Sequence, residues 1–220
     1  RIRRLLFAGN RAVATERLRE LAGLAEGQPY NDVNVADARF RILEHYGRLG
    51  YPNAQLTVER EFSGDEKEVL LTFRVEEGAR LRYGKVIVAG NLRTRDELVV
   101  RELDLPPGGV FDEREVQRGK QRLHRMGIFS GVSVETLPGA DPRKDRDVLV
   151  RLEEDHFGSV DIGVGYGSFD RARGFIEIGH RNVGGLNRRV SLKGEFSSLI
   201  RRLSLNYRDP WLLLDYKLPL

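Results

Sequence analysis

Hydrophobic and polar residues follow two different spacings along this chain. Up to residue 155 the clearest apolar residues lie three and four apart, as do Val35, Ala38, Ile42 and Tyr46. Such spacing is typical of one face of an α-helix. After Asp155 apolar residues occur at every second position, which is typical of strands with one apolar face. The pattern therefore predicts helices and strands in the first part and strands alone in the last.

The first part contains an internal repeat. Segment 7–10 (FAGN) recurs as segment 88–91 (VAGN), 81 residues later. Further on, segment 49–51 (LGY) recurs as segment 126–128 (MGI), with an offset of 77. The offset changes by four residues, close to one α-helical turn, inside the longer helix that we expect. We therefore expect that helix to be one turn shorter in the second copy, with its apolar face kept in phase.

Each copy predicts the order strand, helix, helix, strand, strand. The first strand ends in a Gly-Asn pair, which turns easily because both residues tolerate positive φ. In the second copy Thr94 and Glu97 have the spacing of a capping box for the short helix, and Thr15 is the expected cap in the first copy. The long helix ends at Gly50 or Gly127, as expected for C-terminal glycines.

Two strands close each copy, over residues 55–61 and 69–76 in the first and 132–137 and 147–153 in the second. A three-stranded sheet with two helices on one face is an α+β fold. We therefore expect two βααββ modules, at residues 1–78 and 79–155.

Residues 156–220 contain four alternating segments of about ten residues each, which is typical of transmembrane β-barrel strands. A soluble sheet with one wet face would show the same alternation. Tyr207 and Trp211 lie near a strand end, like the aromatic residues of a membrane interface, and favour the membrane alternative. Four strands cannot close a barrel, so we expect an incomplete one whose open edges can pair with another copy of the chain.

Composition excludes several kinds of chemistry. The chain has no cysteine, so it has no disulfide, thiolate metal site or cysteine nucleophile. Residues 156–220 hold 10 of the 37 basic and 6 of the 33 acidic residues, so the net charge of +4 arises there. These charges alternate with apolar residues and do not form the basic patch of a nucleic-acid binder. The four histidines lack metal-ligand spacing, and residues 163–167 lie inside an alternating strand and open no helix as a nucleotide loop does. We expect no enzyme, no cofactor, no metal and no nucleic-acid partner.

The repeat resembles the POTRA module. The resemblance rests on the Ala-Gly-Asn strand ends, on Tyr30 and Phe111 before the long helices, and on the turns at residues 49–54 and 126–131. The last part resembles the start of the surface-antigen β-barrel, through segments 182–187 (NVGGLN) and 207–211 (YRDPW). Nearly the whole chain is thus similar to the BamA/TamA-like outer-membrane assembly factors. The fold implied is two tandem POTRA modules followed by antiparallel strands of a truncated transmembrane β-barrel, residues 156–220.

The resemblance implies a function, a location and partners. It implies assembly of other proteins into the outer membrane of a Gram-negative bacterium, with the modules in the periplasm. The implied partners are unfolded outer-membrane proteins, accessory proteins of the periplasm or outer membrane, and the lipid bilayer. Two alternatives remain, a two-partner secretion transporter that exports one substrate, and a periplasmic interaction scaffold.

The resemblance also implies two binding sites. The second strand of each module would lie at a sheet edge and accept a client strand by β-augmentation. The residues expected to bind the client are Gln55, Leu56, Thr57, Val58, Glu59, Val132, Ser133 and Val134. The alternative is that charge at Glu59 to Glu61 merely blunts the edge. The first barrel strand would form a lateral seam through Val160, Ile162, Gly163, Val164, Gly165 and Tyr166. Glycine adds no cross-strand contact, so we expect weak pairing there.

Overall fold

A computed structural model describes residues 1–64, 67–168 and 171–211, and of Arg171 the backbone only. These residues form two compact units. Unit 1 comprises Arg1–Lys85, Pro106–Glu115 and Thr136–Val148, and unit 2 comprises Val86–Leu105, Val116–Glu135 and Leu149–Leu220. In the described part of the chain, no helix combines the length and the apolar character needed to cross a membrane.

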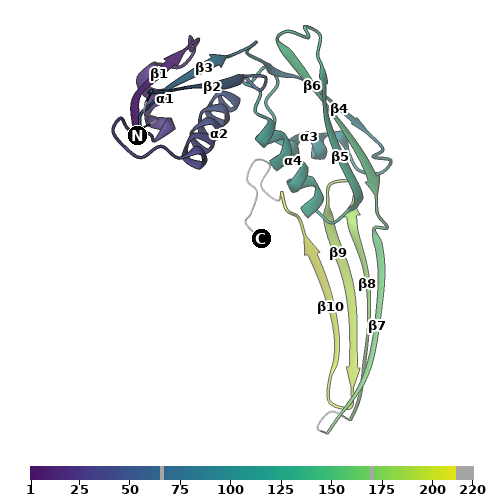
Figure 1. Cartoon of the computed structure of the whole chain (residues 1–220). Helices are drawn as coiled ribbons and strands as arrows, with labels where there is room; N and C mark the ends of the chain where they lie inside the picture. The colour runs from purple at the N-terminus through teal and green to yellow at the C-terminus, as the bar shows by residue number, and fades with distance from the viewer. Residues whose placement is uncertain (65–66, 169–170, 212–220) are drawn as a thin grey trace. The chain divides into compact units, whose positions relative to one another are not determined.

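The first module has the expected βααββ order. Its elements are β1 (Ile2–Ala8), α1 (Thr15–Ala22), α2 (Asp32–Arg48), β2 (Gln55–Phe62) and β3 (Val69–Glu76). The sheet has the order β1-β3-β2, with β1 parallel and β2 antiparallel to β3. Both helices cover one face of this sheet (Figure 1).

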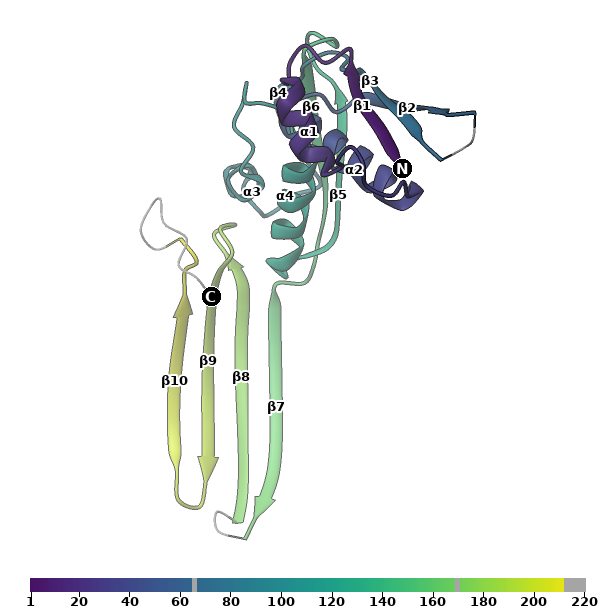
Figure 2. The same cartoon turned by 60° about the vertical axis from the view of Figure 1, so that its left-hand side comes forward.

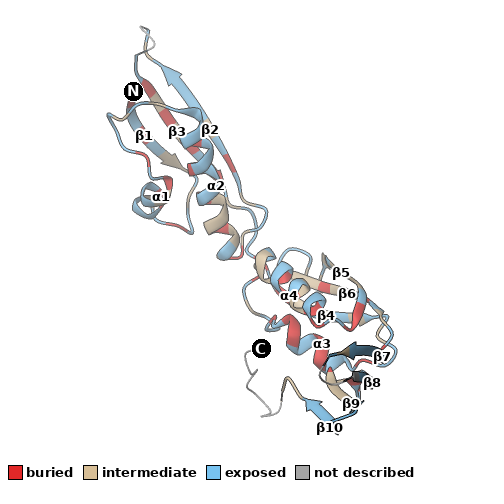
Figure 3. Ribbon diagram, turned by 90° about the horizontal axis from the view of Figure 1, so that it is seen from below, coloured by how far each residue is buried: buried red, intermediate tan, exposed pale blue. Residues whose placement is uncertain are grey.

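The core of the first module lies between the central strand and the long helix. Alternate residues of β3 are buried, as the two-residue strand period requires. They face the apolar stripe of α2 that the sequence predicts, and Figure 3 shows buried residues on both elements. The buried residues of this layer are Val69, Leu71, Phe73, Val75, Val35, Ala38, Ile42 and Tyr46.

The second module repeats the order. Its elements are β4 (Arg82–Ala89), α3 (Asp96–Leu103), α4 (Glu113–Arg125), β5 (Phe129–Pro138) and β6 (Asp145–Glu154), and its sheet order is β4-β6-β5. Helix α2 has 17 residues and α4 has 13. The expectation of a helix shortened by one turn is therefore confirmed. Gly50 and Gly127 both have positive φ, 91° and 67°, as expected for residues that end a helix.

Two helix caps differ from the expectation. Helix α3 begins at Asp96 after Arg95, and no side chain caps it, so Thr94 with Glu97 is not a capping box. Helix α1 begins at Thr15 itself and also lacks a side-chain cap. Both threonines have other partners, since Thr15 Oγ1 accepts a hydrogen bond from Asn10 and Thr94 Oγ1 accepts one from Asn182. Tertiary contacts have taken the hydroxyl groups that local capping would use.

The last part forms a separate four-stranded antiparallel sheet in the order β10-β9-β8-β7, in which each strand pairs with the next along the chain (Figure 2). The strands are β7 (Gly158–Gly167), β8 (Arg171–Val183), β9 (Arg188–Ser197) and β10 (Arg201–Arg208). This confirms the four expected strands. Residues 212–220, which end the segment expected to form the incomplete barrel, lie outside the described residues.

Candidate functional site

The edge strand β2 directs half of its backbone groups away from the sheet. Its only neighbour in the sheet is β3. Ser63 N donates to Glu68 O at 2.8 Å, so odd-numbered residues here bond toward β3. Successive residues of a strand point their backbone groups in opposite directions in the sheet plane. The backbone groups of Leu56, Val58 and Arg60 therefore point outward.

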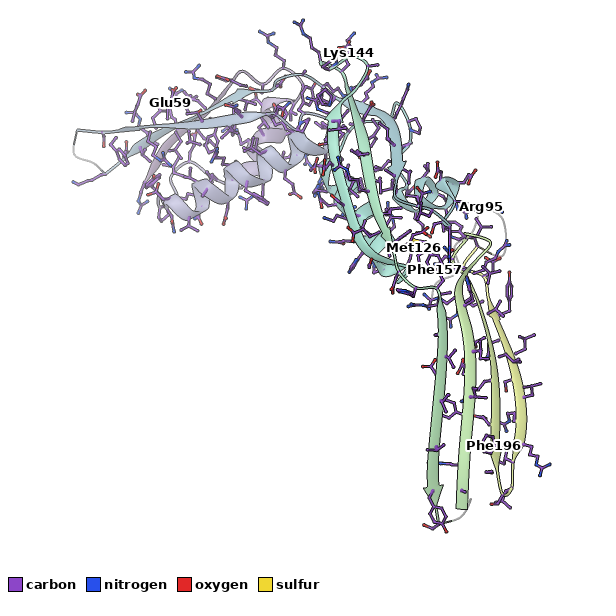
Figure 4. The ribbon with its side chains drawn as sticks, turned by 90° about the vertical axis from the view of Figure 1, so that its right-hand side faces the viewer. Glu59, Arg95, Met126, Lys144, Phe157 and Phe196 are labelled. Atoms are coloured by element: carbon purple, nitrogen blue, oxygen red, sulfur yellow. The ribbon has the colours of Figure 1, made fainter. Side chains whose placement is uncertain are left out.

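Two arginine side chains already contact this edge. The carbonyl oxygen of Leu56 accepts a hydrogen bond from Arg39 Nε at 2.9 Å, and that of Val58 accepts a weaker one from Arg60 Nη1 at 3.4 Å. Glu59 instead pairs with Arg74 Nε at 3.1 Å, and Figure 4 shows it on the sheet face opposite α2. Its charge is thus turned away from the strip where a new strand would add.

The opposite edge of each sheet is covered by the loop that precedes the long helix. Ile2 exchanges backbone hydrogen bonds with residues 27–28 at 2.9 and 2.7 Å. Tyr83 does the same with residues 108–109, at 2.9 and 2.8 Å. Because strands β1 and β4 are occupied in this way, β2 and β5 are the edges left for an incoming strand. The structure therefore places all eight expected client-binding residues on these edge strands, and their role stays a prediction.

The expected seam strand β7 also lies at an edge, beside β8 only. Its pairing with β8 is continuous, over ten pairs from Gly158↔His180 to Gly167↔Arg171. A Cβ built on Gly163 would lie 2.2 Å from the ring of Phe175, its cross-strand partner. The expectation that this glycine lacks a cross-strand contact is therefore wrong, since an aromatic ring packs directly on its backbone.

The sheet β7–β10 has two chemically different faces. On one face, which we call the apolar face, the register aligns Val160, Ile178, Leu192 and Leu205 in one row. These side chains are exposed, as is Ile162 at 71 %. The opposite face is polar and carries, for example, a 2.6 Å ion pair between Lys193 and Glu195. An exposed apolar face backed by a charged one is typical of barrel strands that separate lipid from an aqueous interior.

Sequence analysis missed the contacts that attach unit 2's helices to this sheet. The turn at residues 182–187, which we call the junction turn, lies against residues 93–95. Asn182 Nδ2 donates to Thr94 Oγ1 at 2.9 Å, and Arg95 N donates to Gly185 O at 3.0 Å. Thr94 and Asn182 are both buried, so each satisfies the other's polar group away from water. The sequence marked this segment as a turn but gave no sign of its partner.

The C-terminal end of α4 also contacts the sheet. Arg189 Nη2 donates to Met126 O at 2.9 Å, and Arg181 Nη1 donates to Gly127 O at 3.2 Å. Cations at a helix C-terminus complement its unpaired carbonyl groups and its dipole. Figure 4 shows Met126, Phe157 and Arg95 near one end of the sheet, with Phe196 near the other. We call the end beside Met126 the module end.

Charged side chains of the described residues form pairs and small networks. In residues 1–64, 67–168 and 171–211, no three His, Asp or Glu side chains are grouped so that they could hold a metal ion. Arg114 binds both Glu44, at 2.5 Å, and Asp112, at 3.0 Å. These carboxylates are therefore engaged by a guanidinium group, an arrangement that fits a structural ion pair and not a catalytic site.

Comparison with known proteins identifies the class of module. The family model described as POTRA, "Surface antigen variable number repeat", matches residues 1–78 and 81–155. These matches cover more than half of the chain, which therefore belongs to the POTRA family.

The relatives and solved structures that it resembles are BamA proteins. It is 27 % identical over 209 residues to the outer membrane protein assembly factor BamA of Nitratidesulfovibrio vulgaris, covering 93 % of this chain and 26 % of that protein. It is 25 % identical over 198 residues to BamA of Neisseria meningitidis, covering 90 % of this chain and 25 % of that protein. The crystal structure of Haemophilus ducreyi BamA lacking POTRA domains 1–3 has a TM-score of 0.81 at 23 % identity, covering 96 % of this chain and 40 % of that one. The chain thus spans about a quarter of these two curated relatives.

Proposed function

We propose that this chain is part of a protein that assembles other proteins into the outer membrane. It lies at the outer membrane, with its two POTRA modules in the periplasm. The modules receive extended segments of unfolded outer-membrane proteins at β2 and β5 and pass them to the seam strand β7. The observation that carries this proposal is the open edge of β2 on a sheet whose other edge is covered by its own loop.

The surface beside the β2 edge has the chemistry to bind an amphipathic strand. Arg39 reaches from α2 to Leu56 O, so this flank of the helix borders the edge. On the exposed side of α2, Val33 and Phe40 leave 64 % and 69 % of their surfaces in solvent. A strand added to β2 would form main-chain hydrogen bonds at the edge and place alternate apolar side chains against the helix. Main-chain recognition tolerates many client sequences.

The alternatives from the sequence have weaker support. A two-partner secretion transporter is favoured only by a likeness of fold, since CdiB from Escherichia coli has a TM-score of 0.50 at 16 % identity. The curated relatives above are assembly factors. A water-soluble scaffold conflicts with the exposed apolar face of β7–β10, which would be costly in water. We propose no catalytic step, and the two open edges of that sheet, β7 and β10, would also let isolated copies pair.

Proline substitution at Arg60 tests the edge. The N–H of this residue points outward, so Arg60→Pro removes a docking donor and leaves the β2–β3 hydrogen bonds in place. Arg60→Ala is the matched control, because it removes the same side chain and keeps the N–H. We expect Arg60→Pro in the full-length protein to reduce site-specific cross-linking of a client to β2 and to slow client insertion several-fold. Equal cross-linking in the two variants would refute the role of this edge.

A further inference from the structure

A polar groove lies at the module end of the apolar face. It has a volume of about 430 Å³, and its lining includes Arg95, Glu97, Arg101, Arg188, Asp209 and Trp211. This volume is in the range of pockets that bind small ligands. All six residues belong to unit 2, and neither the expected edge sites nor the seam includes any of them.

The groove begins where the apolar face ends. Arg188 lies two residues before Val190 on β9, and Asp209 lies two residues after Tyr207 on β10, so each shares the apolar face with its neighbour. Asp209 Oδ2 accepts hydrogen bonds from Arg188 Nε at 2.8 Å and from Tyr207 OH at 3.2 Å. If the apolar face lies in lipid, as the proposed function requires, this groove is at the level of the phospholipid headgroups. Tyrosine and tryptophan are enriched at that level.

The groove offers charges of both signs. Arg188 and Asp209 already pair with each other. The guanidinium group of Arg101 stacks 4.2 Å above the ring of Trp211, which holds it in position. Among the residues that the structure describes, none forms an ion pair or hydrogen bond with the side chain of Arg95 or Glu97. Two guanidinium groups and one carboxylate are therefore available to a ligand.

We propose that this groove binds a phospholipid headgroup that carries a phosphate and a primary ammonium group, as phosphoethanolamine does. Arg95 and Arg101 bind the phosphate, since guanidinium groups form paired, charge-assisted hydrogen bonds with phosphate oxygens. Glu97 accepts hydrogen bonds from the ammonium group.

Other headgroups fit this set of charges less well. A quaternary ammonium has no N–H to donate to Glu97, and the face of Trp211 that could attract it already carries Arg101. An anionic headgroup without an ammonium group leaves Glu97 unpaired beside negative charge. The groove therefore distinguishes phosphatidylethanolamine from phosphatidylcholine and phosphatidylglycerol.

Native mass spectrometry of the full-length protein tests this assignment. The protein, released from detergent micelles, is titrated with the three phospholipids carrying identical acyl chains. We expect phosphatidylethanolamine to bind about tenfold more tightly than phosphatidylcholine, and Arg95→Gln to lower its affinity about tenfold. Arg82→Gln is the matched control, because Arg82 is an exposed arginine of the same module whose side chain has no partner within the described residues. Its affinity should be unchanged.

Glu97→Gln isolates the recognition of the ammonium group. This variant should lose the preference for phosphatidylethanolamine over phosphatidylglycerol and keep binding to the phosphate. Equal affinity of the wild type for all three lipids, or no effect of Arg95→Gln, would overturn the proposal. Client insertion is measured on the same samples. Normal insertion without lipid selectivity refutes this inference alone, whereas absence of insertion by the wild type refutes the proposed function.

Discussion

At the scale of single residues, the repeat preserves side chains that bind backbone groups. Glu77 Oε1 accepts hydrogen bonds from Arg11 N at 2.6 Å and Ala12 N at 2.7 Å. In the second module Glu154 Oε1 accepts from Thr94 N at 2.7 Å and Arg93 N at 3.0 Å. The two glutamates are 77 residues apart, the offset found for the end of the repeat. Each one fixes the loop between the first strand and the short helix of its module.

The same offsets show where the second module lost a helical turn. Arg41 Nε donates to Leu21 O at 2.7 Å, and Arg122 Nε donates to Glu102 O at 2.7 Å. Both arginines lie on the long helix and satisfy unpaired carbonyl groups at the end of the short one. They are 81 residues apart, so the four missing residues lie after Arg122, toward the end of α4.

Glu154 should make the stability of unit 2 depend on pH. Burial raises the pKa of its carboxyl group, but hydrogen bonds from Thr94 and Arg93 outweigh burial and hold the pKa below the ordinary value. A lowered pKa in the folded state means that the stabilisation is present above the pKa of the unfolded chain. It is lost as the pH falls through the lower, folded-state pKa.

We expect Glu154→Gln to destabilise this loop by about 1–2 kcal/mol near pH 7, the cost of losing hydrogen bonds to a charged group. The deficit should shrink below about pH 4, where the wild-type carboxylate itself becomes protonated. Hydrogen exchange of residues 91–98 measures the effect, with the adjacent exposed Glu153→Gln as control. A constant deficit from pH 7 to pH 4 would contradict the role of the ionised carboxylate.

At the scale of elements, the junction turn connects the sheet to the helices of unit 2. Gly185 has a φ of 73°, and a Cβ there would lie 2.4 Å from Arg93 O. Gly184 has a similar φ of 67°, but nothing lies within 4 Å of the position of its Cβ. The two neighbouring glycines therefore share the same backbone strain, and only Gly185 also needs the space.

Alanine at these two positions separates strain from contact. Both Gly184→Ala and Gly185→Ala should cost about 1 kcal/mol for the left-handed backbone. Gly185→Ala should in addition push the turn away from residues 93–95 and expose Thr94 and Asn182, at a further cost of about 1–3 kcal/mol. Limited proteolysis and hydrogen exchange at residues 182–187 should detect faster opening in Gly185→Ala than in Gly184→Ala. Equal opening of both variants would show that the close contact is unimportant.

At the scale of the whole molecule, the question is which solvent surrounds the sheet β7–β10. Ile162 and Asp161 are neighbours on β7 that point to opposite faces, Ile162 to the apolar one and Asp161 to the polar one. In a bilayer the two residues meet different solvents. In water both would tolerate charge.

Arginine substitutions should distinguish the two environments. We expect Ile162→Arg to destabilise the inserted full-length protein by about 2–4 kcal/mol if Ile162 faces the lipid core, and Asp161→Arg to have a much smaller effect. Folding into phospholipid vesicles, followed by denaturant titration, gives both values. Similar small effects of the two substitutions would favour the soluble scaffold and remove the membrane assignment.

The sequence by itself determined the repeated βααββ order, the helix shortened by one turn and the four alternating strands. Those features depend on periodicity and on glycines such as Gly50 and Gly127, and neighbouring residues are enough to specify them. Only the tertiary structure decided which sheet edges are covered, that Phe175 packs on Gly163, and that Thr94 binds Asn182 instead of capping its own helix. These depend on groups brought together from distant positions, 88 residues apart for Thr94 and Asn182. Local propensity cannot specify such contacts, because a hydroxyl group or a strand edge takes whichever partner the folded chain places beside it.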